Sequence, residues 1–132
     1  VIDCIGSDHA PHQIADKDMS LRGFHECPSG FPGLETELLL VGSFLRENNA
    51  ALSNGAWLES LIRLINTRAA EIFGLADRSK LAEGKNADLV ILDGPAIIDA
   101  TQFKTKAKYS PFNGMKTDIS VYKTILGGEV VG

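Results

Sequence analysis

Seven consecutive residues near the start of the chain carry side chains of the types that catalyse hydrolysis. Residues 6–12 read Gly-Ser-Asp-His-Ala-Pro-His, so one carboxylate, Asp8, stands next to two imidazoles, His9 and His12. A carboxylate beside a divalent cation stays ionised and can accept a proton from water, and histidine can ligate a metal or donate to an anionic substrate. Asp8 is therefore a candidate metal ligand and general base, and His12 is a candidate for the same pocket.

Two other interpretations of this segment remain open. In the first, Asp8 caps the loop backbone and the histidines are solvated. In the second, a self-contained zinc site forms, because His9 and His12 are spaced like some zinc-ligand pairs and His25 and Cys27 follow downstream. Pro11 argues against this local site, since it breaks any helix that would align the two histidines of the pair.

The elements expected around these residues include both helices and strands. Residues 1–5 are rich in β-branched side chains and predict a buried strand that ends at Gly6. A strand followed by a rigid polar loop is how α/β barrels present catalytic residues. Apolar periodicity predicts helices at 34–48, 57–65 and 68–73, with Thr67 as the cap of the third and Gly74 as its left-handed end.

The pattern changes after Leu75. Strands are expected at 89–92 and 121–126, and Gly127-Gly128 predicts a tight hairpin into residues 129–131. The sequence therefore indicates an α/β first part, residues 1–75, and an all-β second part, residues 76–132.

Composition excludes several classes of partner. The chain has 132 residues, a net charge of −4 and no cluster of Lys and Arg, so nucleic-acid binding is not expected. The longest purely apolar run, 38–41, is too short for a membrane span. Two cysteines in a chain of this size favour a reducing, cytoplasmic location. Because the sequence starts in mid-strand pattern without Met, we expect it to be a piece of a longer protein.

Residues 6–12, followed after four intervening residues by Lys17, resemble the second signature of dihydroorotases, which are members of the amidohydrolase superfamily. Residues 28–36 (PSGFPGLET) are similar to the loop and helix start that follow in that family, and residues 84–93 (GKNADLVILD) resemble a strand found across the superfamily. Allantoinases and hydantoinases are a weaker match, since they usually differ at the His12 position and in the Pro-Ser-Gly loop. Further similar segments are 69–75, 111–114 and 124–131.

The resemblance implies a role for each candidate residue. The family residue at Asp8 binds the metal and carries a proton between metal-bound hydroxide and the ring nitrogen of dihydroorotate, so Asp8 is both the catalytic residue and a metal ligand. The residue at His12 contacts the substrate carboxylate, and the backbone at Ser29 and Gly30 belongs to a substrate-holding segment. The cofactor implied is a binuclear zinc centre.

The resemblance also implies a fold. The chain corresponds to a C-terminal fragment of a (β/α)8 TIM-barrel metallo-hydrolase, with the last strand and helices in residues 1–75. Residues 76–132 then form the C-terminal β segment of a composite β-sandwich domain.

The family's zinc centre needs a His-x-His pair and further ligands, and this chain contains no His-x-His. We therefore expect the chain alone not to interconvert N-carbamoyl-L-aspartate and dihydroorotate, the step of pyrimidine biosynthesis that the full-length family catalyses. We also expect it to self-associate or to assemble with the remaining barrel portion. The alternatives are a non-catalytic dihydroorotase-like module and a related allantoinase or hydantoinase.

Overall fold

The chain folds into two compact units, each assembled from segments that are distant in the sequence. The computed structural model describes residues 2–21, 23–49, 55–75 and 77–132. The first unit draws on residues 1–6, 39–96 and 117–132, and the second on residues 7–38 and 97–116. Helices and strands both occur, as the α/β prediction requires. The predicted division near residue 75 into a barrel part and a sandwich part stays a prediction.

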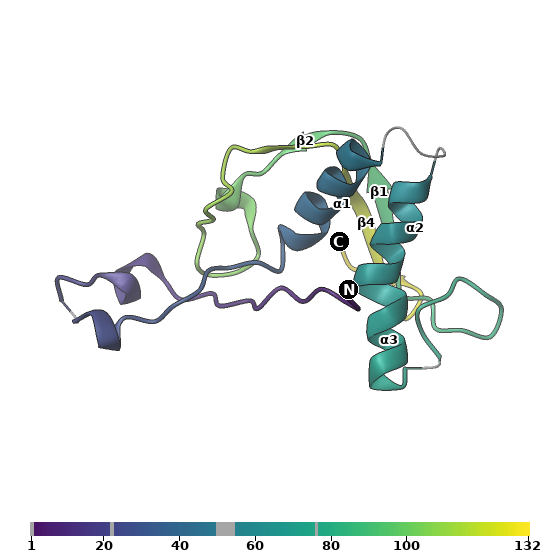
Figure 1. The fold of residues 1–132 in the computed structure, drawn as a ribbon, viewed down its shortest axis with the longest axis horizontal. Coiled ribbons are helices and arrows are strands. Elements are labelled where there is room, and N and C mark those ends of the chain that lie inside the picture. The colour runs from purple at the N-terminus through teal and green to yellow at the C-terminus, as the bar shows by residue number, and fades with distance from the viewer. Residues whose placement is uncertain (1, 22, 50–54, 76) are drawn as a thin grey trace. The chain divides into compact units, whose positions relative to one another are not determined.

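A three-stranded antiparallel sheet with the order β1-β4-β5 lies in the first unit. Its strands are β1 (Leu89–Asp93), β4 (Ser120–Leu126) and β5 (Glu129–Val130), and β1 and β4 run side by side (Figure 1). The strands predicted at 89–92 and 121–126 and the hairpin after the second of them are thereby confirmed. Gly127 and Gly128 make the turn with φ of 59° and 89°, values that glycine adopts at no steric cost.

The helices lie in the ranges that the apolar periodicity predicts, except that the first begins at Glu37 and not at residue 34, and the second ends at Ile62 and not at residue 65. They are α1 (Glu37–Asn48), α2 (Ala56–Ile62) and α3 (Arg68–Phe73), and a π-helical turn, η3 (Arg63–Thr67), joins α2 to α3. Gly74 ends α3 in the left-handed region, as predicted. The predicted cap at Thr67 is wrong, because Thr67 has helical φ and ψ and makes no side-chain cap bond.

The π turn provides the attachment for the segment that leads into residues 6–12. In an α-helix the carbonyl of Leu64 would accept from the N–H of Arg68, but here that N–H donates to Arg63. The released Leu64 carbonyl accepts a hydrogen bond from Ile5 N–H at 3.0 Å. The strand predicted at 1–5 is wrong for the described residues 2–5, since they bond to a helix and not to a strand ladder. Val1 lies outside the described residues.

An ionic contact holds the same segment to α3. Arg68 Nη2 lies 3.0 Å from Asp3 Oδ1, and Arg68 Nη1 lies 2.6 Å from Glu71 Oε2. The hydrogen bond to Asp3 and then that to Glu71 hold the pKa of Arg68 above its usual value. These side chains are partly exposed, so the contact contributes more to orientation than to stability.

Close packing in the first unit centres on Gly42, Leu61 and Ile119. Leu61 on α2 and Ile119 just before β4 are 2% and 1% exposed, respectively. A Cβ on Gly42 of α1 would lie 2.2 Å from Ile119 Cδ1 and 3.3 Å from Leu61 Cδ2. The absence of a side chain at Gly42 therefore lets α1 approach both residues.

Replacing Gly42 by Ala is expected to destabilise the protein by about 1–2 kcal/mol. Overpacking against a filled core costs about 1–3 kcal/mol, and the better helix propensity of Ala returns up to about 1 kcal/mol. Urea unfolding would measure the difference, with Glu47→Ala on the exposed side of α1 as a control that should change stability by less than about 0.5 kcal/mol. Unchanged or increased stability in Gly42→Ala would mean that Ile119 repacks without cost.

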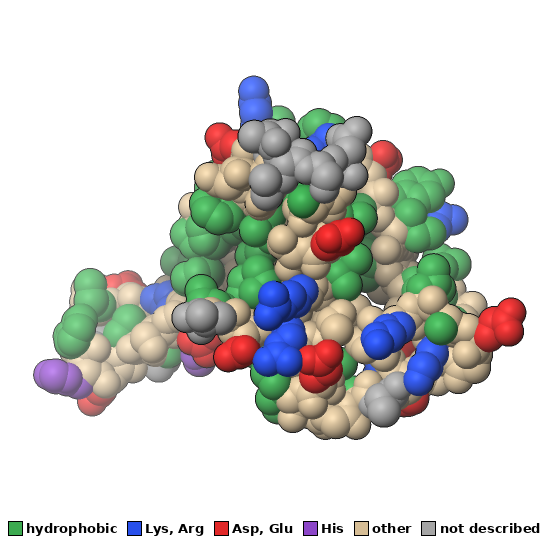
Figure 2. Space-filling model, turned by 45° about the vertical axis from the view of Figure 1, so that its right-hand side comes forward, with side chains coloured by type: hydrophobic (Ala, Val, Ile, Leu, Met, Phe, Trp, Pro, Cys, Tyr) green, Lys and Arg blue, Asp and Glu red, His purple; other side chains and the backbone are tan. Residues whose placement is uncertain are grey.

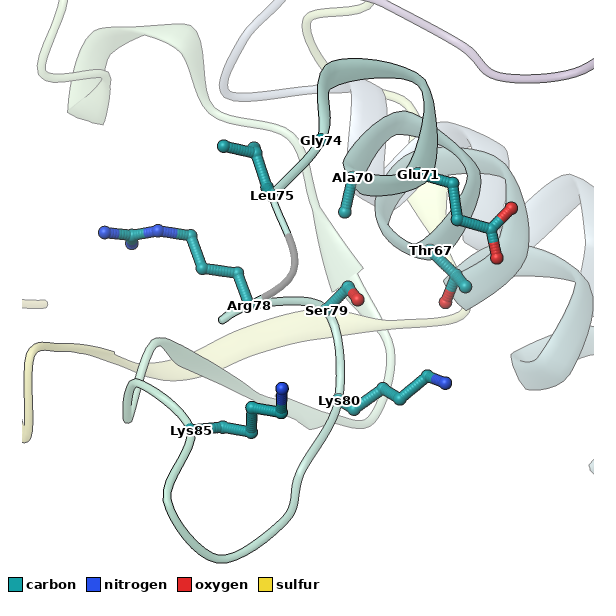
Figure 3. A pocket seen from close by; sticks show the side chains of 9 residues that line it. All are labelled: Thr67, Ala70, Glu71, Gly74, Leu75, Arg78, Ser79, Lys80 and Lys85. Carbon is teal, nitrogen blue, oxygen red and sulfur yellow. The ribbon is translucent and has the colours of Figure 1, made fainter.

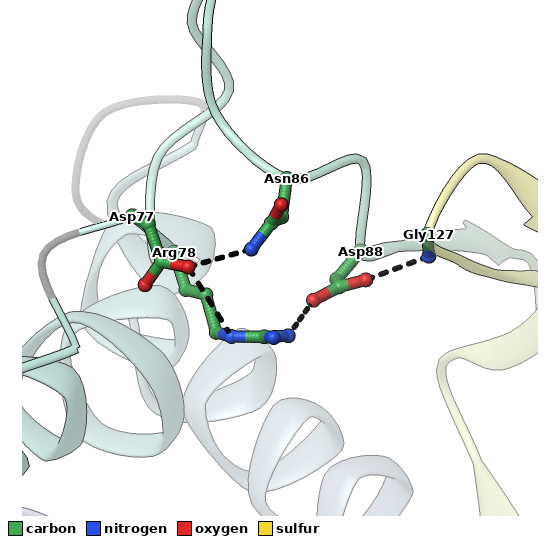
Figure 4. Close-up of polar contacts among 5 residues, drawn as sticks. All are labelled: Asp77, Arg78, Asn86, Asp88 and Gly127. Atoms are coloured by element: carbon green, nitrogen blue, oxygen red, sulfur yellow. Dashed lines mark hydrogen bonds and ion pairs between the residues drawn. The ribbon is translucent and has the colours of Figure 1, made fainter.

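A polar network joins the turn before β1 to the β4–β5 hairpin (Figure 4). Asp88 accepts from the N–H of Gly127 at 2.8 Å and pairs with the guanidinium of Arg78. Beside it, the amide of Asn86 donates to Asp77 Oδ2 at 2.6 Å. The polar residues of the segment 84–93 thus have a structural role, because their contacts bind loops to the sheet.

The second unit is held by contacts between its two segments. The Glu35 carboxylate accepts from the N–H groups of Lys104 and Thr105 at 2.7 and 3.0 Å. The rings of Phe31 and Phe112 meet edge to face with centroids 5.5 Å apart. The short helical turns in this unit are η1 (Ile14–Lys17), η2 (Phe24–Glu26) and η4 (Ala100–Gln102).

Two strands were not predicted, β2 (Ala96–Ile97) and β3 (Lys116–Thr117), which pair with each other. A strand of two residues is too short to show alternation in a sequence. Among the described residues, no helix is both long and apolar enough to cross a membrane.

Candidate functional site

The two segments that the sequence singled out lie against each other in the second unit. The N–H of Ala10 donates to the carbonyl of Phe31 at 3.0 Å. The N–H of Leu34 donates to Nδ1 of His9 at 3.1 Å. The structure therefore brings the loop of residues 6–12 next to the loop of residues 28–33.

Asp8 occupies an uncommon backbone conformation at the centre of the first loop. Its φ is +43°, in the left-handed region that Asp and Asn tolerate better than most residues. Its side chain is exposed. No hydrogen bond from a described residue reaches the Asp8 carboxylate, so the structure does not support the interpretation that Asp8 caps the loop backbone. The carboxylate is accessible for proton transfer or metal binding.

The two histidines of the loop have different surroundings. His9 is half-buried, and because its Nδ1 accepts from Leu34, a neutral His9 carries its proton on Nε2. His12 is exposed, and its N–H donates to the carbonyl of Ala10 at 2.9 Å. His9 therefore joins the two loops, whereas the imidazole of His12 is free to meet a ligand.

Glycine is required at two points of the second loop. Gly30 has φ +82°, and a Cβ there would lie 2.6 Å from Ala10 Cβ. A Cβ on Gly33 would lie 2.7 Å from the carbonyl oxygen of Ser7. Both glycines let the backbone of this loop approach the loop that carries Asp8. Ser29 and Gly30, the predicted substrate-binding residues, are exposed.

Lys17 is a residue whose importance the sequence analysis missed. Its Nζ donates to the carbonyls of Pro28 at 2.8 Å and of Gly30 at 2.6 Å, and its own carbonyl accepts from Cys27 Sγ at 3.2 Å. The available signal was its place in the signature, five residues after His12.

The turn after Lys17 is also fixed by hydrogen bonds. Asp18 Oδ1 accepts from the hydroxyl and the N–H of Ser20, at 2.6 and 2.9 Å. The bond from the Ser20 side chain, followed by that from its backbone, lowers the pKa of Asp18. The Asp18 carboxylate therefore forms its hydrogen bonds within its own turn.

The residues of this chain do not by themselves fit a binuclear zinc centre. In the described ranges, no group of three or more His, Cys, Asp or Glu side chains is placed to hold a metal ion. The local zinc site considered for Asp8, His9, His12, His25 and Cys27 is therefore wrong. His9 bonds to Leu34 instead, Cys27 donates to Lys17, and the His25 ring packs edge to face on Phe24. Asp8 can supply one carboxylate to a centre built with other ligands.

A cavity of about 340 Å³ lies elsewhere, in the first unit (Figure 3). It is lined by α3 and the loops after it, including Glu71, Arg78 and Lys80. It contains none of the predicted site residues, and Arg78 is already paired with Asp88. Because the chemistry of the signature lies on the loops of the second unit, we place the candidate site there.

Comparison with known proteins shows the family to which the chain is similar. The Amidohydrolase family matches residues 1–131. A dihydroorotase of Anaplasma phagocytophilum is 39% identical over 98% of this chain and 27% of its own length. A dihydroorotase of Methanothermobacter thermautotrophicus is 33% identical over 98% of this chain and 28% of its own length.

A solved structure is similar over the same extent. The L-hydantoinase (dihydropyrimidinase) of Arthrobacter aurescens superimposes with a TM-score of 0.80 and 34% identity, covering 99% of this chain and 29% of that protein. The chain thus spans less than a third of the length of each of these three proteins. Because the family match extends over nearly every residue, including both loops of the candidate site, this chain belongs to the amidohydrolase family.

Proposed function

We propose that this chain is the C-terminal part of a dihydroorotase, a cyclic amide hydrolase that interconverts N-carbamoyl-L-aspartate and dihydroorotate. The observation that carries the proposal is the hydrogen bond from Ala10 N–H to the Phe31 carbonyl. It joins the loop that carries Asp8 and His12 to the loop that carries Ser29 and Gly30. All four residues of the proposed site therefore lie in the second unit. In this proposal residues 1–75 complete a TIM barrel and residues 76–132 complete a β-sandwich.

Asp8 is the proton carrier of the proposed reaction. Ring opening forms a bond from a water oxygen to the ring carbonyl carbon and breaks the bond between that carbon and the ring nitrogen. Asp8 accepts the proton that the water loses and delivers it to the departing nitrogen; ring closure runs in reverse. Positioned acid–base catalysis of this kind contributes roughly 10²–10⁴-fold to the rate.

Substrate recognition falls to the other members of the site. The exposed imidazole of His12 suits the substrate carboxylate, because a histidine can donate a hydrogen bond to an anion. The Ser29–Gly30 backbone offers further polar groups on the loop that packs against Ala10. A binuclear zinc centre in the longer protein would take a single carboxylate, that of Asp8, from this chain.

Assembly with further barrel segments is part of the proposal. Several large hydrophobic side chains of the described residues are highly exposed, including Phe24 at 77%, Phe73 at 73% and Leu81 at 87%. Figure 2 shows hydrophobic side chains reaching the surface between charged ones on the face drawn. Exposed apolar surface of this kind is typical of a surface that other segments cover.

The test compares the longer protein that contains this sequence with the 132-residue chain. We expect the longer protein to hydrolyse dihydroorotate, followed by loss of its ultraviolet absorbance or by assay of carbamoyl aspartate, and the 132-residue chain to show no turnover. Turnover by the short chain would contradict the proposed division of the site. No turnover of any cyclic amide by the longer protein would favour the non-catalytic module.

A hydantoinase is the second candidate, because the L-hydantoinase structure is 34% identical. The same assay with hydantoin and allantoin distinguishes the two. We expect dihydroorotate to have the highest kcat/KM, since only that substrate carries the carboxylate assigned to His12. A preference for hydantoin would replace dihydroorotase by hydantoinase and leave the family assignment intact.

A further inference from the structure

We propose that Lys17 is a positioning residue that orients the backbone of residues 28–31 toward the substrate. Its ammonium would turn the N–H groups of Ser29 and Phe31 to face an oxygen of the cyclic amide. This inference rests on the proposed function, since that function makes the loop a substrate-binding segment. The role is additional to those of Asp8 and His12.

The orientation follows from the geometry of the peptide bond. Within a trans peptide unit the C=O and the N–H point in opposite directions, and none of the described residues has a cis peptide bond. The Pro28 carbonyl points to Lys17 Nζ at 2.8 Å, so the N–H of Ser29 points away from the lysine. The Gly30 carbonyl points to the same nitrogen at 2.6 Å, so the N–H of Phe31 also points away.

The two N–H groups are suitable donors for a ligand. No described residue accepts a hydrogen bond from either of them. Ser29 is exposed, and Phe31 is 40% exposed. Backbone donors held in place before a ligand arrives bind oxygen atoms without a cost of reorganisation.

A lysine suits this task better than a neutral side chain. Its ammonium has three donors, so it can serve two carbonyls at once, and hydrogen bonds from a charged donor are shorter and stronger than neutral ones. Gly30 contributes the other condition, since its φ of +82° is a conformation that glycine adopts without steric cost. The bond from Cys27 Sγ to the Lys17 carbonyl attaches the lysine backbone to the start of the same loop.

The first test is kinetic and uses the longer, active protein. Lys17→Met removes the ammonium and keeps an unbranched side chain, whereas Lys17→Arg keeps a charged donor. We expect Lys17→Met to raise KM for dihydroorotate about tenfold, equal to about 1.4 kcal/mol of binding, and to change kcat less than about threefold. Lys17→Arg should recover most of the loss. Lys106→Met, at an exposed lysine of the same unit, should match the parent.

Two kinetic outcomes would overturn the proposal. Lys17→Met could match Lys106→Met in KM, in which case the orientation of the loop does not depend on the ammonium. Alternatively, kcat and KM could both change together with a lowered unfolding temperature that Lys17→Arg does not restore, which would indicate a merely structural lysine.

A second measurement keeps the inference separate from the proposed function. If the parent protein hydrolyses no cyclic amide, hydrogen exchange still reports the position of the loop. We expect the amides of Ala10 and Leu34, which bond to the two loops, to exchange at least about tenfold faster in Lys17→Met than in Lys106→Met. Equal exchange in the two variants would overturn the role of Lys17 whatever the activity of the parent.

Discussion

Replacing Asp8 by Asn is expected to lower kcat for dihydroorotate about 10³-fold in the longer protein, within the range for a lost general acid–base group. Asparagine has nearly the same shape as aspartate but cannot accept the proton. The backbone should tolerate the change, because Asp8 has φ +43° and Asn is one of the few residues that adopt this region readily. We therefore expect the unfolding temperature to stay within about 2 °C of the parent.

Two comparisons make the Asp8 experiment specific. Glu26→Gln removes a charge from an exposed carboxylate of the same unit and should leave kcat unchanged. Asp8→Ala should lose activity to the same extent but also lower the unfolding temperature, since alanine is strained at positive φ. If Asp8→Asn retained more than about a tenth of the parental kcat, a role for Asp8 in proton transfer would be untenable.

The fold could be predicted where local chemistry determines it. The apolar stripe of α1 and the Gly127-Gly128 turn depend on a few neighbouring residues, and both appear as expected. The π turn at 63–67 has no comparable signal in the sequence. It depends on one extra residue in a helical turn and on a hydrogen bond from the distant Ile5 N–H to the carbonyl that the turn releases. For the same reason the strand expected at 1–5 was wrong in residues 2–5. A strand depends on neighbouring strands that local sequence does not reveal.

The candidate site could be predicted only in part. The residue types near Asp8 indicated acid–base chemistry, and the resemblance indicated the loop of Ser29 and Gly30. That the two loops touch, through Ala10 and Phe31, is a finding of the structure. Lys17 was noted as part of the signature but had no assigned role, because it acts on backbone carbonyls and a sequence does not show which carbonyls lie within reach of a long side chain. The roles assigned to Asp8 and His12 stay predictions.

Replacing Gly30 by Ala is expected to lower kcat/KM about 100-fold, the scale associated with a displacement of about 1 Å in a catalytic site. The added Cβ would lie 2.6 Å from Ala10 Cβ, whereas carbon atoms in contact lie about 3.5–4.0 Å apart. Alanine at φ +82° would add backbone strain of roughly 1–2 kcal/mol. One of the two loops must move, so the Ser29–Gly30 backbone and the Asp8 carboxylate would lose their relative placement. Steady-state kinetics with dihydroorotate would measure the loss.

A double variant distinguishes the effect of the steric contact between the two loops from the effect of backbone strain at residue 30. Ala10→Gly removes the methyl group that the new Cβ would meet, so adding it to Gly30→Ala should recover about tenfold in kcat/KM, the coupling of about 1.4 kcal/mol expected for residues in contact. The remaining loss would then come from φ alone. Gly23→Ala is the matched control, because a Cβ at Gly23 meets nothing within 4 Å. If Ala10→Gly gave no recovery, the contact between the loops would not govern activity, and the positive φ of Gly30 would explain the whole effect.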